Sequence, residues 1–283
     1  MIRSATLQKD LEQIGTIKTL TSVFEGIASM QIAKIKNQVV QSKQFFAELW
    51  QIYSQMRVDA DRITSEAEQA KRAHMRNVFI VITSQGGLSG DIDAKIVNWM
   101  VKQYDNKTTD IMVMGGHGAT LLSQANIPIK KYFKLPEGDG TVEVAPIIAE
   151  LANYNQATAF YQTYVSLAEQ QTAKIELISA VKALSNETLA EEEIISTRDY
   201  DFEPSQEEII EYMESSMLGI ALGQVILESK LAQYASRFNA MSAAKIKATD
   251  LQGDLKLKYN RSRRSENDER SKEVINSIKS LAV

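Results

Sequence analysis

Residues 205–241 read SQEEIIEYMESSMLGIALGQVILESKLAQYASRFNAM, and this stretch predicts one long helix. No proline occurs between Ser205 and Val283. An apolar seam with alternating spacings of three and four consists of Ile210, Met213, Met217, Ile220, Gln224, Leu227, Leu231, Tyr234, Phe238 and Met241. That spacing is typical of a coiled coil, because an ordinary surface helix has a wider stripe that repeats at 3.6 residues. A helix over 205–283 would extend roughly 110 Å, which favours a mechanical or scaffolding role.

The N-terminal residues 1–72 have a similar pattern and also lack proline. Their seam consists of Leu7, Leu11, Ile14, Ile17, Leu20, Phe24 and Ile27. After Ile27 the spacing slips by one position. We expect the helix to continue through this slip, because slips of this kind change a supercoil locally without ending the helix. Beyond the slip the seam continues through Ala28, Ile32, Ile35 and Val39. Gly26 either marks a close approach to a partner helix or is a tolerated glycine that costs about 1 kcal/mol.

The middle of the chain alternates between apolar runs, glycine turns and helical spacing. The β-branched run 77–84 ends at the turn 86–90, and helical spacing follows from Asp93 to Tyr104. A second run, 110–114, ends at the glycines around His117 and precedes another helical stretch. This alternation is typical of a βαβ layer with a parallel sheet. Further strands are expected at 129–133, 157–165 and 173–178, the last two as a hairpin.

These patterns together predict an α/β protein with long terminal helices. Residues 1–72 and 205–283 are expected to form an antiparallel two-helix coiled coil, and residues 73–204 a central Rossmann-like α/β domain. The stretch Asp199–Pro204 (DYDFEP) marks the boundary before the C-terminal helix. Ser205 is the expected N-cap of that helix, with Glu208 at the capping-box position.

The composition excludes several classes of function. The chain has 283 residues, no cysteine and two histidines, His74 and His117, so disulfides and thiolate metal sites are excluded. A histidine-based zinc site or a Ser-His-Asp triad is disfavoured for the same reason. The net charge of −4 gives no attraction for nucleic acid. No apolar run approaches the roughly 18 residues of a transmembrane helix, and no signal segment is seen, so we expect a cytoplasmic chain. We also expect it to hold no cofactor and no metal.

Two glycine turns invite comparison with ligand sites. The turn 86–90 is similar to loops whose backbone N–H groups hold a phosphate at a helix N-terminus. Its spacing matches neither the dinucleotide nor the Walker pattern, and Asp91 and Asp93 would repel a phosphate, so a tight structural turn is expected. No acid or nucleophile that converges on His117 can be named from the sequence, and we expect no catalytic role for it.

Two charged stretches have a structural and a functional interpretation. Asp199, Asp201 and Glu203 are expected to be a solvated linker and helix start rather than a metal site. Residues 260–273 (NRSRRSENDERSKE) are almost wholly polar. They form either an exposed helix with ion pairs four residues apart or a helix face that touches several partner surfaces in turn.

Three collinear segments resemble the gamma subunit family of F-type ATP synthases. Residues 11–34 (LEQIGTIKTLTSVFEGIASMQIAK) are similar to the family's opening helix, and residues 82–90 (ITSQGGLSG) resemble its central signature Ile-Thr-Ser-Asp-(Arg/Lys)-Gly-Leu-Cys-Gly. The strongest resemblance is C-terminal, in residues 236–250 (SRFNAMSAAKIKATD) and 255–263 (LKLKYNRSR). Departures from the family's pattern at Glu25, Gln31 and 264–268 imply a divergent member, and the sodium-associated N-type branch is one alternative, since Gly26-Ile-Ala28 is similar to its gamma subunits.

The resemblance implies a mechanical role. In the family, the paired terminal helices form an asymmetric shaft inside a ring of three alpha and three beta subunits, where ATP is made or hydrolysed. The α/β domain lies at the foot, with the epsilon subunit and the membrane c-ring. By this resemblance the chain has no catalytic residues of its own, is present once per complex, and associates peripherally with the cytoplasmic face of the cell membrane.

The resemblance also implies which residues contact partners. These candidates are Phe24, Glu25, Gln31, Arg237, Met241, Arg261, Arg263, Arg264 and Val283. The family usually carries basic residues at the positions of Glu25 and Gln31, and the segment 264–268 also departs from its pattern. The charges on the shaft are therefore expected to differ from those of its relatives.

Two other hypotheses stay open beside the rotor shaft. In the first, the chain is a nucleotide-sensing α/β domain with helical dimerisation arms. In the second, it is a purely structural coiled-coil scaffold. Nucleotide binding that depends on Gly86 or Gly90 would favour the first, whereas the shaft requires larger nucleotide-binding partner subunits.

Overall fold

The computed structural model describes residues 4–58, 75–136, 142–177 and 206–281. The chain divides into two compact units. The first, here called the helical unit, contains residues 1–28 and 237–283, and the second, the sheet unit, contains residues 29–236. The expected division at 72 and 204 falls on residues outside the described ranges and stays a prediction.

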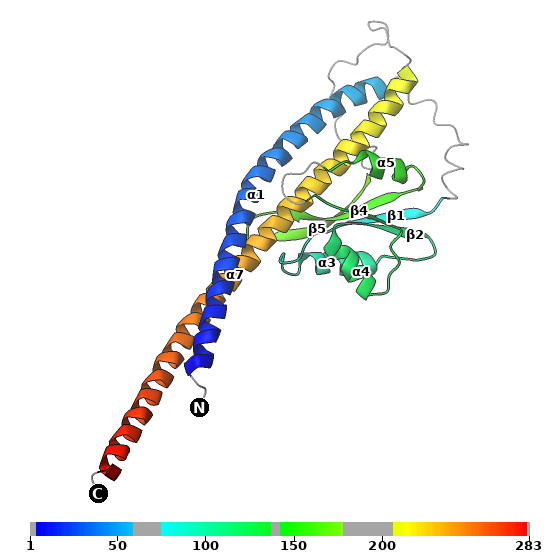
Figure 1. The fold of residues 1–283 in the computed structure, drawn as a ribbon. Coiled ribbons are helices and arrows are strands. Elements are labelled where there is room, and N and C mark those ends of the chain that lie inside the picture. The colour runs from blue at the N-terminus through cyan, green and yellow to red at the C-terminus, as the bar shows by residue number, and fades with distance from the viewer. Residues whose placement is uncertain (1–3, 59–74, 137–141, 178–205, 282–283) are drawn as a thin grey trace. The chain divides into compact units, whose positions relative to one another are not determined.

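Two long helices form the ends of the chain, as the sequence predicts. Helix α1 comprises Ser4–Val58 and helix α7 comprises Gln206–Leu281 (Figure 1). Both contribute residues to both units. The expected N-cap Ser205 and the boundary stretch 199–204 lie outside the described residues.

The sheet unit contains a five-stranded sheet in the order β3-β2-β1-β4-β5. The strands are β1 (Asn77–Ile82), β2 (Thr109–Met114), β3 (Lys131–Phe133), β4 (Ala157–Tyr164) and β5 (Gln170–Glu176). Strands β1 to β4 are parallel, and β5 pairs antiparallel with β4. The parallel layer and the hairpin are therefore confirmed, although β5 begins at Gln170, three residues before the predicted start.

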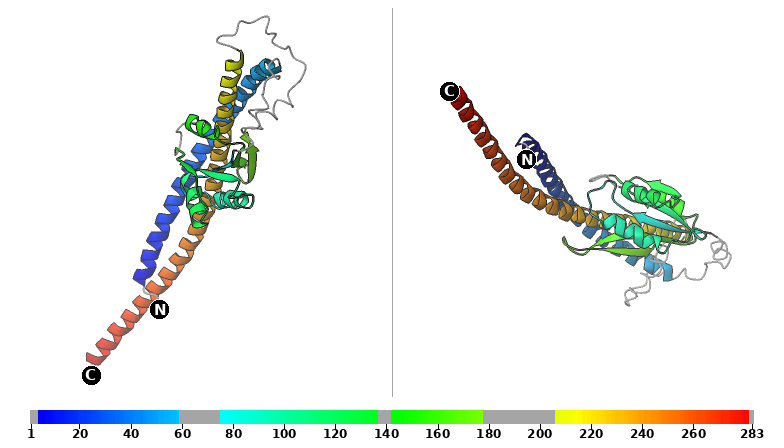
Figure 2. Two further views of the ribbon diagram at one scale, coloured as in Figure 1. Left: turned by 90° about the vertical axis from the view of Figure 1, so that its right-hand side faces the viewer. Right: turned by 90° about the horizontal axis from the view of Figure 1, so that it is seen from below.

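Helices cover both faces of this sheet. Helices α3 (Ile92–Val101) and α4 (Gly116–Gln124) lie on one side, and α5 (Ala145–Leu151) lies on the other (Figure 1). The same layers can be followed in two further views (Figure 2). The sequence predicted α3 and α4 but not α5, which has seven residues and Pro146 in its first turn. Seven residues are too few for a helical period to stand out.

The alternating side chains of the strands divide the core of the sheet unit in two. Ile80 of β1 and Met112 of β2 point to the face that is covered by Ile147 of α5 and Leu222 of α7. Their neighbours in the strands point to the opposite face and pack against α3 and α4: Val81, Ile111 and Val113. Because α7 buries a side of its surface on the sheet, the long helix is part of this domain as well as part of a coiled coil.

Candidate functional site

The two long helices pair antiparallel within the helical unit. Near the start of α1, the backbone N–H and the hydroxyl of Ser4 donate to the carboxylate of Glu266, at 2.7 and 2.6 Å. Further along, Lys18 Nζ lies 3.4 Å from Gln252 Oε1. These partners advance along α1 while they retreat by the same number of residues along α7. The pairing therefore keeps one register, as a coiled coil requires.

A third pair in the same register joins Glu25 to Lys245, whose Nζ lies 2.8 Å from Glu25 Oε2. The hydrogen bond from Lys245 lowers the pKa of Glu25 below its ordinary value of 4.5, and burial opposes this shift. A hydrogen bond from Ser242 and the charge of Lys245 add to the lowering. Likewise, the pKa of Glu266 is lowered chiefly by the side-chain and backbone hydrogen bonds from Ser4.

The buried seam of α1 differs from the predicted one in its middle part. Ile17, Leu20, Phe24 and Ile27 are exposed, at 46%, 51%, 37% and 40%, so the expectation that they form the seam is wrong. The spacing set by Leu7 instead continues without a slip through polar positions. That seam comprises Leu7, Leu11, Ile14, Lys18, Thr21, Glu25, Ala28, Ile32, Ile35 and Val39. The expected slip is absent because the polar residues Lys18, Thr21 and Glu25 occupy the seam positions between Ile14 and Ala28.

The seam of α7 agrees better with the prediction. Met217, Leu231 and Met241 are buried. In the sheet unit, Leu231 packs in one cluster with Ile35 and Val39 of α1. In the helical unit the same spacing continues beyond the predicted end to Ala248, which is 5% exposed.

The exposed residues of α1 form an apolar stripe on the outside of the helix, here called the outer stripe: Ile17, Leu20, Phe24 and Ile27. No other described atom lies within 4 Å of a Cβ built on Gly26, so its interpretation as a close approach is wrong. Gly15 is a glycine that faces the partner helix, because a Cβ built on it would lie 3.5 Å from Gln252 Nε2. An exposed stripe of this kind can bind an apolar surface of another protein.

The structure places the other predicted partner-contact residues in different surroundings. Arg261, Arg263 and Arg264 are exposed, whereas Arg237 is half-buried and Met241 is buried in the seam. Gln31 is half-buried, and its Oε1 has no hydrogen-bond partner among the described residues. Val283 lies outside the described ranges. Whether these residues contact partners stays a prediction.

In the sheet unit, His117 lies beside an acid that no pattern in the sequence connects with it. Its Nδ1 lies 2.7 Å from Oδ2 of Asp93, a residue in the first turn of α3 that is fully buried. The hydroxyl of Ser84 donates to the same carboxylate oxygen. The structure therefore supplies an acid that could not be named from the sequence. The serine bonds to the aspartate and not to the histidine, so the three do not form a nucleophile–base pair.

The same carboxylate also holds Ser84, which precedes the glycine turn 86–90. Asp93 Oδ1 accepts the backbone N–H of Ser84 at 3.2 Å, and Leu88 and Gly90 have positive φ values of 71° and 67°. A phosphate bound in the turn would meet the carboxylate of Asp93 and would be repelled. The geometry supports the interpretation as a tight structural turn.

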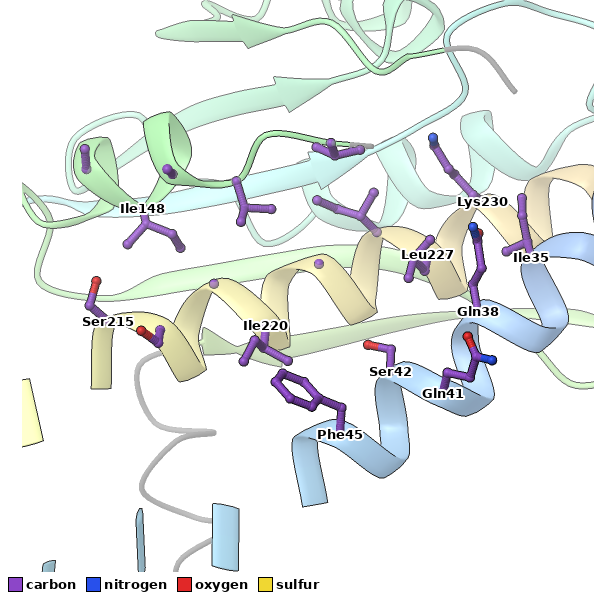
Figure 3. Close-up of a pocket in the computed structure, with 18 of the residues that line it drawn as sticks. Ile35, Gln38, Gln41, Ser42, Phe45, Ile148, Ser215, Ile220, Leu227 and Lys230 are labelled. Carbon is purple, nitrogen blue, oxygen red and sulfur yellow. The ribbon is translucent and has the colours of Figure 1, made fainter. Parts of the chain in front are cut away.

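A groove of about 950 Å³ lies in the sheet unit between α1, α5 and α7 (Figure 3). Ile148 and Ile220 line it with other apolar side chains, and Gln38, Gln41 and Ser42 of α1 contribute polar groups. Among the described residues, no three acidic or histidine side chains converge to hold a metal ion. No helix within the described ranges is long and apolar enough to span a membrane.

Comparison with known proteins gives one consistent result. The family model described as ATP synthase matches residues 4–281. The ATP synthase gamma chain of Mycoplasmoides gallisepticum is 23% identical over 279 residues, with 95% of this chain and 96% of that relative covered. The gamma chain of Exiguobacterium sibiricum is 26% identical over 279 residues, with 92% and 94% covered.

Solved structures show the same fold. A chain of the Euglena gracilis mitochondrial ATP synthase, in a structure of its OSCP, F1 and c-ring parts, superposes with a TM-score of 0.66 at 15% identity. That match covers 98% of this chain and 95% of the other. A chain of the central stalk and c-ring of the Tetrahymena thermophila mitochondrial enzyme has a TM-score of 0.59 at 18% identity, with 80% and 99% covered.

Proposed function

The chain belongs to the ATP synthase gamma family, and we propose that it is the central-stalk shaft of a rotary F-type ATP synthase. In this role it couples ion flow through a membrane ring to ATP synthesis or hydrolysis in a ring of alpha and beta subunits. The family match over residues 4–281 supports the assignment.

The observation that carries the proposal is the single register of the two helices in the helical unit. Ser4, Lys18 and Glu25 each meet a partner on α7 at matching steps along the helix. Side-chain pairs at successive steps resist sliding of one helix along the other, because every pair must break when the register changes. A shaft that transmits torque needs this resistance.

The surface of the helical unit supports a shaft that biases its partners. The outer stripe is apolar, whereas residues 260–273 of α7 are polar and mostly exposed. The outer stripe lies on one side of α1, so a ring subunit at that level meets it at some angles of rotation and not at others. Rotation can shift the conformations of the ring subunits only if the shaft binds those conformations unequally. The one-sided outer stripe provides such a difference.

The proposal includes the partners and the place of the chain. We infer that alpha and beta subunits surround the helical unit, and that the epsilon subunit and the c-ring bind the α/β domain of the sheet unit. One copy of the chain would be present per complex. The complex would hold the chain peripherally at the cytoplasmic face of the cell membrane. We expect catalysis in the ring subunits, with no catalytic group, cofactor or metal from this chain.

Reconstitution tests the proposal. The chain should co-purify with two larger nucleotide-binding subunits that are each in threefold excess over it. Vesicles that contain the whole complex should couple ATP hydrolysis to ion transport, and the complex without this chain should lose transport. Isolation of the chain as a lone, stable monomer from cells that make the complex would contradict the assignment.

A further inference from the structure

Resting on the proposed function, we propose that a buried hydrogen-bond network anchors α7 to the sheet and carries torque between them. The network, here called the Asp93 network, joins six side chains of the sheet unit: Ser84, Asp93, His117, Gln162, Ser229 and Gln233. Its members act as positioning residues for rotary coupling.

Gln162 of β4 is the bridge between the long helix and the rest of the network. Its Nε2 donates to Asp93 Oδ1 at 3.2 Å, and its Oε1 accepts the hydroxyl of Ser229 of α7 at 2.5 Å. Because a carboxylate can only accept hydrogen bonds, the amide nitrogen of Gln162 must face Asp93. The amide oxygen is then left for the donors on α7, so the amide has one orientation.

One turn further along α7, Gln233 reinforces this contact. Its Nε2 lies 3.0 Å from Ser229 Oγ and 3.4 Å from Gln162 Oε1. Gln162 and Ser229 are fully buried, and Gln233 is 6% exposed. A buried polar group that loses its hydrogen-bond partner destabilises the folded state. Removal of one side chain of the bridge therefore weakens the contacts of the others.

At the other end, Asp93 ties the bridge to the two loops that follow β1 and β2. Ser84 follows β1, and His117 lies in the first turn of α4, which follows β2. Both contact the carboxylate of Asp93. These loops lie at the carboxyl edge of the parallel strands, where open α/β sheets commonly hold a ligand. Here side chains of α7 occupy that position.

A second bond fixes α7 to the same edge. The hydroxyl of Ser236 donates to the backbone oxygen of Ser89 in the glycine turn at 2.7 Å. Ser229, Gln233 and Ser236 follow one another at spacings of four and three, so they lie on one face of α7. The face that is turned toward the sheet edge is thereby fixed at successive helical turns.

Directional bonds suit this role better than apolar contacts alone. Leu222, Val225 and Ile226 of α7 also pack on the sheet. Apolar burial is largely non-directional, so it holds the helix on the sheet but opposes a small rotation about the helix axis weakly. A hydrogen bond weakens steeply when its angle changes, so the network opposes that rotation. Torque applied to the sheet therefore reaches α7 chiefly through such directional bonds, those of Gln162 and that between Ser236 and Ser89.

Two variants test the network, and one matched control accompanies them. Ser229→Ala removes the hydroxyl on α7 and leaves the bond between Gln162 and Asp93. Gln162→Leu removes the bridge at similar volume. Gln171→Leu makes the same chemical change on the exposed surface of β5, outside the network.

The first measurement follows the anchoring itself in the full chain. Because the chain has no cysteine, Tyr212→Cys and Lys102→Cys introduce the only two sites for spin labels. Both positions are exposed, and both belong to the sheet unit. The distribution of distances between the labels should broaden in Ser229→Ala and Gln162→Leu and stay narrow in Gln171→Leu. Unchanged distributions in both network variants would overturn the proposal.

The second measurement uses the whole complex in vesicles and gives ion transport per ATP hydrolysed. We expect the network variants to keep ATP hydrolysis near the level of the control while transport per ATP falls several-fold. A broadened distance distribution with unchanged transport per ATP would overturn the torque role. If transport by the wild-type complex does not require this chain, the proposed function fails instead, so the two failures can be told apart.

Discussion

Glu25 and Lys245 form an ion pair across the seam of the helical unit, with 2.8 Å between carboxylate and ammonium. The side chain of Glu25 is 17% exposed and that of Lys245 is 39% exposed. A charged pair in a coiled-coil seam contributes less stability than apolar packing but specifies the register, because a shifted register leaves each charge without its partner.

A charge swap should reveal the contribution of this ion pair to the free energy of unfolding. Lys245→Met should lower the free energy of unfolding by about 1 kcal/mol or less at neutral pH, since the pair is partly exposed. The double variant Glu25→Lys, Lys245→Glu should recover most of the loss. Urea unfolding of the full chain measures both effects, and a swap that recovers nothing would contradict a direct pairing.

The contribution of Glu25 should depend on pH in a defined direction. Its folded-state pKa is lowered below 4.5. The stabilisation is therefore fully present above about 4.5 and is lost as the pH falls through the lowered value. Urea unfolding at neutral and at acid pH should show that Glu25→Gln costs less at acid pH. An equal cost at both pH values would show that the pair does not depend on the charge of Glu25.

Two isoleucines on α1 offer a matched comparison of seam and outer stripe. Ile35 is 2% exposed and Ile27 is 40% exposed. Ile35→Ala should lower the free energy of unfolding by about 2–4 kcal/mol, because it leaves a cavity in the core. Ile27→Ala should cost less than about 1 kcal/mol in the isolated chain. Calorimetry of both variants checks the difference, and equal losses would contradict the observed seam.

Ile27→Ala also tests the outer stripe as a binding surface. We expect this variant to weaken assembly with the ring subunits, because it removes apolar surface that the isolated chain leaves in water. Ala33→Ser changes another exposed position of α1 and is the control. Gel filtration of reconstituted complexes would show the effect, and equal assembly of both variants would exclude Ile27 from the interface.

Two glycine substitutions separate a required glycine from a permissive one. Gly115 has a φ of 99°, and a side chain there would clash with the backbone oxygen of Thr83. Gly115→Ala should therefore cost at least about 2 kcal/mol. Nothing lies within 4 Å of a Cβ on Gly86, so Gly86→Ala should be nearly neutral. Thermal unfolding would check both, and a large loss at Gly86 would indicate a role that the turn geometry does not explain.

Two tyrosines should titrate at unusually high pH. Burial, with the nearby charge of Asp110, raises the pKa of Tyr154 to about 12, and burial, with Glu228, does the same for Tyr161. Each raised pKa stabilises the folded chain below pH 10, and this stability is lost as the pH rises through about 12. Ultraviolet titration should show Tyr154 and Tyr161 among the late tyrosines, and Tyr154→Phe should remove one of them. Titration of both near pH 10 would contradict their burial.

The sequence predicted the elements whose signals are local. The apolar runs of β1 and β2 each end at glycines, and the long helices keep a regular spacing without proline. The middle of the α1 seam could not be predicted because Lys18 and Glu25 occupy seam positions, and the apolar residues Ile17 and Phe24 stand one position before them. Only their partners on α7 explain why polar residues lie there.

The Asp93 network was missed for a related reason. Its residues come from five separate segments, and no pattern along the chain connects them. Two weak signals were present: Gln162 interrupts the apolar strand β4, and Ser229 and Gln233 lie four residues apart on a largely apolar helix. A polar residue at a position expected to be buried indicates a partner but does not identify it.

Rotation of a single complex tests the central claim most directly. A cysteine introduced at the exposed Lys107 of the sheet unit can carry a bead, while the ring subunits are fixed to a surface. If the chain is the shaft, the bead should turn in one direction when ATP is added and stop when ATP is removed. ATP hydrolysis by the same complexes with a bead that only fluctuates about one position would contradict the account.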